Sequence, residues 1–200
     1  MRMKLTLRLI PALMFVVAVL PVYSQVGAAA TVGGIPVVVG GGMSDFLLDW
    51  GPGQRMEGIT AWADLYPRDL PRKLDGLGIE VEGRDTNFGR PAGISRMRQD
   101  TGLGGAIYAW NRYRNFRPYG KFLFGIGSID FPPATGSTYS HDAFLVLAPG
   151  GGAEYRVWKH VWVRGDYEYQ IWRHTFGPTD LTPQGFTVGA SYDFRPVRSE

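Results

Sequence analysis

The chain lacks cysteine altogether, which excludes a disulfide scaffold, thiolate zinc sites and cysteine nucleophiles. The chain also has little excess of one sign of charge: it contains 21 Lys and Arg and 18 Asp and Glu, and its formal net charge is only +3. So small and mixed a charge does not indicate a nucleic-acid partner. No stretch shows a convincing helical period, and after the N-terminus no run approaches the about 18 apolar residues of a membrane-spanning helix.

Catalytic and metal-binding signatures are equally hard to find. The three histidines stand singly, without HxH or HExxH spacing, and GxSxG and phosphate-loop motifs are absent. Glu80 and Glu82, and likewise Asp166 and Glu168, are paired carboxylates that share a strand face. Arginines with the same alternation favour an ion-pair network over acid–base chemistry for these pairs. We therefore expect no catalytic residue, no cofactor and no metal.

Glycine and proline are plentiful, with 28 and 14 residues, and aromatic residues make up 14% of the chain. Glycine and proline destabilise helices by about 1 and 3 kcal/mol per site. This composition favours many short strands joined by turns.

The N-terminus is typical of a secretory signal peptide. Met1 to Arg8 carries three positive charges and no acid, an apolar segment follows, and Ser24 ends a small-x-small type cleavage site. The apolar run is shorter than the about 20 residues of a transmembrane anchor. We expect residues 1–24 to be cleaved and residues 25–36 to lead into the folded domain, with cleavage after Ala28 or Ala30 as the alternatives.

The mature chain alternates apolar and polar residues with the period of a β-strand, most strictly over Phe186 to Phe194. The eight expected strands are Val37–Met43, Ile59–Leu65, Leu77–Arg84, Met97–Ala109, Pro118–Ile126, Phe144–Val157, Val161–Trp172 and Phe186–Phe194. Connections of roughly 11 to 15 residues follow the odd-numbered strands, including Arg173 to Pro183 after the seventh. Shorter connections follow the even-numbered strands, as in an up-and-down transmembrane barrel.

Alternation alone does not tell which face of a barrel meets water, and a soluble barrel alternates in the same way. The polar face carries charges of both signs at matching depth, which suits a filled polar lumen. The expected lumen charge network comprises Glu80, Glu82, Arg84, Arg98, Asp100, Lys121, Glu154, Arg156, Arg164, Asp166 and Glu168.

Aromatic residues gather where the short turns join the strands, as in the interfacial girdle of a membrane barrel. These residues are Tyr66, Trp110, Trp158, Tyr192 and Phe194. Together with the signal peptide, they favour a barrel whose apolar face meets lipid.

The last strand reads Thr187-x-Gly189-x-x-Tyr192-x-Phe194, which resembles the terminal assembly signal of bacterial outer-membrane barrels. It departs from that pattern in one respect, because Phe194 is followed by a tail, residues 195–200. The resemblance implies that the barrel assembly machinery reads this strand.

From Val37 to Phe194 the chain resembles the small eight-stranded outer-membrane barrels, such as the transmembrane domain of outer membrane protein A. Segments that carry the resemblance are Gly58–Tyr66, Leu77–Arg84, Arg117–Lys121 and Val163–Trp172. The resemblance implies an antiparallel all-β transmembrane barrel over residues 37–194 in the outer membrane of a Gram-negative bacterium, with both termini periplasmic. We expect no counterpart of the family's peptidoglycan-binding domain after the barrel.

Eight strands enclose just enough space for side chains, so a large pore is not expected. The expected role is structural or interactive, with outer-membrane lipid as a partner and no assigned ligand for the outer loops. One alternative is a lipid-modifying acylase or acyltransferase, for which Ser140 and His141 offer a lone pair of candidate residues. The other is a soluble periplasmic barrel that binds a small apolar ligand.

Overall fold

The computed structural model describes residues 37–49, 55–67, 70–88, 98–110, 114–131, 140–176 and 179–195. The expected signal peptide and lead-in lie outside these residues. Within the described ranges, no helix is both long and apolar enough to cross a membrane.

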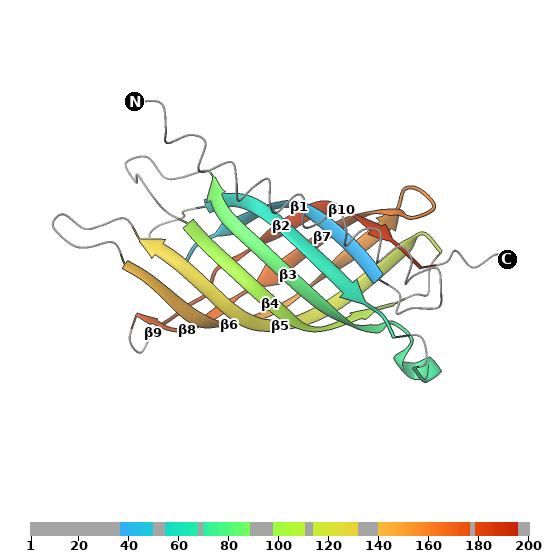
Figure 1. Ribbon diagram of the computed structural model, residues 1–200, viewed down its shortest axis with the longest axis horizontal. Coiled ribbons are helices and arrows are strands. Elements are labelled where there is room, and N and C mark those ends of the chain that lie inside the picture. Colours follow the sequence, from blue (N-terminus) through green and yellow to red (C-terminus); the bar gives the residue numbers. More distant parts are fainter. Residues whose placement is uncertain are drawn as a thin grey trace, which may run out of the picture.

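Strands make up nearly all of the described chain (Figure 1). They are β1 (Val37–Leu47), β2 (Arg55–Leu65), β3 (Leu77–Phe88), β4 (Arg98–Ala109), β5 (Phe116–Phe131), β6 (Ser140–Arg156), β7 (Val161–Tyr169), β8 (Ile171–Phe176), β9 (Thr179–Leu181) and β10 (Gln184–Asp193). One short 3-10 turn, η1 (Arg72–Leu74), lies between β2 and β3.

The strands close into a single antiparallel barrel. Their order is β5-β4-β3-β2-β1-β10-β7-β6, and a further pairing between β5 and β6 joins the two ends of this sequence. Because every neighbour pair in the ring is antiparallel, the turns β2–β3, β4–β5 and β6–β7 lie at one end with the start of β1 and the finish of β10. We call this the short-turn end and the opposite one the long-connection end.

The ten strand segments form eight strands of the barrel. β8 continues β7, since Trp172 pairs with Val146 in the same register in which Glu168 pairs with Gly150. β9 continues into β10 on the other side, where the backbone N–H of Gln170 donates to the carbonyl of Pro183 at 2.8 Å. The eight-stranded up-and-down barrel expected from the sequence is therefore confirmed.

One expected loop is not a loop. Arg173 to Pro183 was predicted as a long connection, but β8 and β9 pair across it as a hairpin that extends the barrel wall. Thr182 and Pro183 interrupt the strand here. Proline has no N–H to donate to a ladder, and this break hides the continuing pairing from a reading of periodicity.

The two faces of the wall differ in chemistry as well as in exposure. Burial alternates residue by residue along β2, β3 and β7, with the buried side chains directed into the lumen. The outward residues are large and apolar through the middle of the wall: Met43, Ile59, Ile79, Val81, Phe122, Phe124, Ile126, Leu145, Val163, Phe186 and Val188 are all exposed. This is the reverse of a soluble barrel, which keeps its apolar face inside.

Apolar side chains also close the lumen near each end. Leu103, Leu123, Ile129, Val146, Ala148, Trp172 and Leu181 form one buried cluster toward the long-connection end. Val38, Tyr66, Ile107, Ala109 and Tyr119 form a second near the short-turn end. Glycines make room for two of the buried indole rings, because a side chain on Gly40 would strike Trp62 and one on Gly127 would strike Trp172. The charged interior therefore lies between two apolar layers.

Candidate functional site

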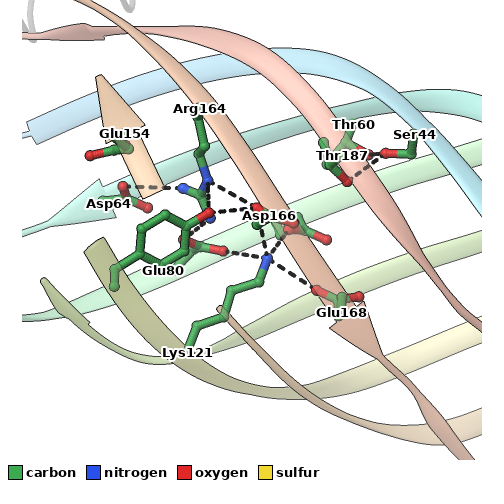
Figure 2. A network of polar contacts seen from close by, with 12 residues as sticks. Ser44, Thr60, Asp64, Glu80, Lys121, Glu154, Arg164, Asp166, Glu168 and Thr187 are labelled. Carbon is green, nitrogen blue, oxygen red and sulfur yellow. Dashed lines mark hydrogen bonds and ion pairs between the residues drawn. The ribbon is translucent and has the colours of Figure 1, made fainter. Parts of the chain in front are cut away.

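Lys121 of β5 stands at the centre of the lumen, surrounded by carboxylates from β3 and β7 (Figure 2). Its ammonium Nζ lies 2.7 Å from Glu82, 3.0 Å from Glu168 and 3.1 Å from Glu80, with Asp166 at 3.6 Å. The alternation of β3 and β7 places each pair of acids on the inner face, two residues apart. One cation thus joins strands from different parts of the barrel.

Arg164 of β7 forms the second centre, nearer the short-turn end (Figure 2). Its guanidinium lies 2.7 Å from Glu80, 3.0 Å from Asp166 and 3.5 Å from Asp64. The Tyr119 hydroxyl accepts a hydrogen bond from Arg164 at 2.7 Å and donates one to Asp166 at 2.8 Å. Planar guanidinium groups suit such multiple pairing, because their N–H donors point in fixed directions.

Arg84 of β3 completes the network toward the long-connection end. It pairs with Glu82 at 2.5 Å and with Glu168 at 2.8 Å, and it donates to the Thr60 hydroxyl at 3.0 Å. Thr60 in turn hydrogen-bonds Ser44, which reaches Thr187 at 2.8 Å. Hydrogen bonds therefore continue from the ion pairs to β1 and β10, the first and last strands of the ring.

A separate cluster closes the short-turn end. Arg117 pairs with Glu154 and lies 3.6 Å from Asp193, and its guanidinium stacks over the Trp162 ring at 4.5 Å. Arg195 pairs with Asp193 at 2.5 Å and lies over the Tyr66 ring at 4.9 Å. The Arg195 side chain, two residues after the end of β10, thus packs against the barrel.

The charged groups at the centre of the network are fully buried. Asp64, Glu80, Arg164 and Glu168 have no exposed surface, so a substrate in solution has no access to their carboxylates or guanidinium. Removing one partner of such a buried pair leaves an uncompensated charge, at a cost of about 3–5 kcal/mol. Within the described residues, no group of three or more potential ligands is placed to hold a metal ion.

The comparisons with known proteins agree with this geometry. The family model of the outer membrane protein beta-barrel domain matches residues 15–194. The chain belongs to this family. No curated protein matches it.

Solved structures of outer-membrane barrels share the fold. OprG from Pseudomonas aeruginosa is 14% identical with a TM-score of 0.57, and the match covers 81% of this chain and 97% of OprG. Ail of Yersinia pestis is 14% identical with a TM-score of 0.56, covering 80% and 98%. Neisserial surface protein A is 13% identical with a TM-score of 0.55, covering 79% and 96%. At these identities the likeness shows the fold of the outer-membrane barrel alone.

Of the eleven residues expected in the lumen network, the structure buries eight. These are Glu80, Glu82, Arg84, Lys121, Glu154, Arg164, Asp166 and Glu168. Glu154 belongs to the cluster at the short-turn end, and the other seven form the central network. Arg156 lies at the rim, where it bonds the Asn115 side chain at 2.7 Å and stacks on Trp162. It joins no ion pair among the described residues.

The assignment of Arg98 and Asp100 to the lumen is wrong. Both face outward, where Arg98 pairs with Asp100 at 2.8 Å and with Asp85 at 3.1 Å, and the Arg98 side chain is 50% exposed. The inward residues of β4 include Leu103 and Ile107 from the two apolar layers beside the polar Gln99 and Thr101. On this strand, therefore, an apolar side chain does not by itself indicate the lipid face.

The expected assembly-signal residues follow the alternation of β10. Thr187 is buried in the lumen, and Gly189 also lies on the inward face beneath the Trp62 ring. Tyr192 is exposed, stacks on His160 at 5.4 Å and lies 4.7 Å from the Phe194 ring. The strand thus presents aromatic rings outward at the short-turn end.

Two further expectations concern single side chains. Tyr66 was placed in the aromatic girdle, but it is buried beneath Arg195 and Arg117. It follows β2 directly and continues that strand's inward direction.

The side chains of Ser140 and His141, on which the lipid-modifying alternative depended, lie outside the described residues.

Several residues of the interior were not anticipated, notably Asp64, Arg117, Tyr119 and Asp193. Asp64 is the single charge in an otherwise uncharged run of β2 and pairs in register with Glu80 on β3. Aligning the two expected strands as a hairpin would have placed Asp64 opposite Glu80, which was already expected in the lumen. Arg117 precedes the expected strand Pro118–Ile126, so alternation gave it no direction. Asp193 does fall on the polar face of the strand Phe186–Phe194, but the expected charge network did not include it.

Proposed function

We propose that this outer-membrane barrel has a structural or surface-interaction role and provides no large pore, with both termini in the periplasm. The filled lumen carries the proposal, because the ion pairs around Lys121 and Arg164 lie between two apolar layers. Eight strands leave space for side chains and little more. An enzyme would need reactive groups that substrate can reach, and the central acids are buried.

The surface role is supported by the contrast between the two ends. The long-connection end carries outward charged residues above the apolar wall, including Asp45, Arg55 and Asp85, and loops are where binding residues concentrate. One structural neighbour, Ail, is named the attachment invasion locus protein. That name describes attachment by Ail, and it supports proposing a surface-interaction role for this barrel.

Conductance tests the filled lumen directly. Purified barrel inserted in a planar bilayer should give no stable current steps of the size that a porin gives in the same bilayer. A variant that removes both central cations, Lys121→Met with Arg164→Met, serves as the matched comparison and should be leakier where it inserts. Stable porin-sized steps from the wild type would refute the proposal.

Orientation is tested by labelling, because the chain has no native cysteine to interfere. Asp49 at the long-connection end and Lys159 at the short-turn end are both exposed. On intact cells, a membrane-impermeant maleimide should label Asp49→Cys and should label Lys159→Cys only after lysis. The opposite pattern would reverse the proposed orientation.

A further inference from the structure

The three turns of the short-turn end share a composition that the barrel fold does not require. Among the side chains that the structure describes, each turn exposes a cation beside at least one large apolar side chain: Lys73 with Leu74, Arg114 with Trp110 and Phe116, and Lys159 with Trp158. We call Lys73, Arg114 and Lys159 the basic collar. Because the turns alternate with strands around the ring, the three cations are distributed around the barrel's perimeter.

The turns are held in place by bonds to the next part of the wall. Gly76 of the first turn accepts a backbone hydrogen bond from Ala109 at 2.8 Å, and Asn115 of the second accepts one from Arg156 at 2.9 Å. The carbonyl of His160 in the third accepts one from Asp193 at 2.8 Å. The backbone of each turn is therefore fixed before a ligand binds, so the entropy lost on binding is mainly that of the side chains.

The two ends of the barrel also differ in the sign of their charge. The segments 66–76, 110–115 and 157–160 contain six Lys or Arg and two Asp, a net charge of +4. At the other end the described outward rim is acidic, with Asp45, Asp49, Glu57, Asp85, Asp100, Asp130 and Asp180 against Arg55, Arg98 and Arg173. All three of those arginines are engaged in ion pairs. Lys73 and Lys159 form no ion pair within the described ranges.

We propose that the basic collar binds the phosphate headgroups of anionic phospholipids, one site at each short turn. This lipid-binding proposal rests on the proposed function only in requiring that the barrel lies in a bilayer. A cation near an anionic bilayer surface favours a charged lipid by about fivefold. Indole and phenyl rings prefer the depth of the headgroups, where an apolar body and a polar surrounding are both available.

A lipid fits this surface better than a soluble anion does. Trp158 is 76% exposed, and the exposed Val157 and Tyr155 continue from it toward the apolar wall. A lipid covers these side chains with its acyl chain while its phosphate meets Lys159. A soluble polyanion would neutralise the lysine and leave the apolar neighbours in water.

Native mass spectrometry of barrel released from an equimolar mixture of phosphatidylglycerol and phosphatidylcholine tests the proposal. We expect the wild type to retain phosphatidylglycerol about fivefold over phosphatidylcholine. Lys73→Gln with Arg114→Gln and Lys159→Gln should bring the ratio close to one. The matched control, Arg55→Gln with Arg98→Gln, removes cations from the opposite rim and should keep the wild-type ratio.

Heat-modifiability on a gel establishes that each variant is folded before its lipids are counted. The proposal is overturned if the collar variant retains the preference, or if both variants lose it equally, since net charge alone would then explain it. Displacement of the lipid by inorganic phosphate at constant ionic strength would assign the site to a free anion and also overturn it. Porin-sized conductance would refute the filled lumen and leave these lipid ratios unchanged, so the two failures are distinguishable.

Discussion

The inner and outer faces of one strand obey opposite rules. On β3, Glu80 and Glu82 point inward and are almost fully buried, whereas Ile79 and Val81 point outward and are 55% and 56% exposed. A water-soluble protein would gain stability from the reverse arrangement. This comparison teaches that the solvent outside the wall is lipid, and that the interior depends on pairing of charges rather than on apolar contact.

The two faces should therefore respond differently to substitution. The lumen depends on specific geometry, so an isolated loss of one partner is costly there even when volume is kept. The lipid face requires only that a side chain be apolar, so its shape matters little and its charge matters greatly. The four tests below follow from this contrast.

The largest effect is expected at the lumen centre. Arg164→Met keeps most of the side-chain volume but removes a cation from Glu80 and Asp166, which keep Lys121, and leaves Asp64 without an ion-pair partner among the described residues. This uncompensated buried charge should cost about 3–5 kcal/mol. Arg55→Met breaks an ion pair that is about half exposed and should cost about 0–1 kcal/mol. Denaturant unfolding in detergent measures both, and equal costs would contradict a buried, interdependent network.

A charge on the lipid face should follow in size. Val188 is 62% exposed near the middle of β10, and Val188→Arg should lower the free energy of unfolding in bilayers by about 2–4 kcal/mol. Val188→Leu keeps the residue apolar and should lie within about 0.5 kcal/mol of wild type. If the arginine variant is as stable as the leucine variant in vesicles, this face does not meet the hydrocarbon.

The outward aromatic rings at the end of β10 should have a smaller energetic effect but a visible one on assembly. Tyr192→Ala with Phe194→Ala removes two ring contacts, together about 1–3 kcal/mol, and weakens the strand proposed to be read by the assembly machinery. The heat-modifiable fraction in purified outer membranes should fall.

Deletion of residues 196–200 is the matched control for the aromatic variant, because it shortens the chain and leaves Arg195 on Asp193 and Tyr66. It should assemble normally. Normal assembly of the aromatic variant beside failure of the deletion would show that the tail, and not the strand, carries the signal.

The smallest difference is expected between adjacent residues of β1. Ser44→Ala removes hydrogen bonds to Thr60 and Thr187 in the lumen and should cost about 0.5–1.5 kcal/mol. Met43→Leu changes only an outward apolar side chain and should have almost no effect, within about 0.5 kcal/mol. Unfolding midpoints in one detergent resolve the two, and a costlier Met43→Leu would show that the outer face is packed against something specific.

Sequence periodicity predicted the parts of the barrel where inner and outer chemistry differ along the whole strand. β7 and β10 alternate strictly, so Arg164, Asp166 and Glu168 were placed inside correctly. β4 misled the same reading, because its inner face mixes the apolar Leu103 and Ile107 with polar residues and its charged Arg98 and Asp100 point outward. Alternation distinguishes the two faces of a strand but does not tell which face points into the lumen.

Other features depended on neighbours that a single strand does not reveal. The role of Asp64 follows from its register with Glu80. The role of Arg195 follows from its contact with Tyr66, which is distant from it in the sequence. The hairpin of β8 and β9 was read as a loop because Pro183 interrupts the pattern while hydrogen bonding continues on both sides. These are tertiary properties, and hydrophobic periodicity carries no signal for them.

The central claim is that the apolar face of the wall meets lipid and the charged face is enclosed. A nitroxide scan of single cysteines along β10, from Gln184 to Asp193, tests it most directly, because the chain has no cysteine of its own. In vesicles, accessibility to oxygen, which partitions into the bilayer, should peak at Phe186, Val188 and Ala190 and fall at Thr187, Gly189 and Ser191. A scan without alternation, or with the opposite phase, would contradict an inside-out barrel in the membrane.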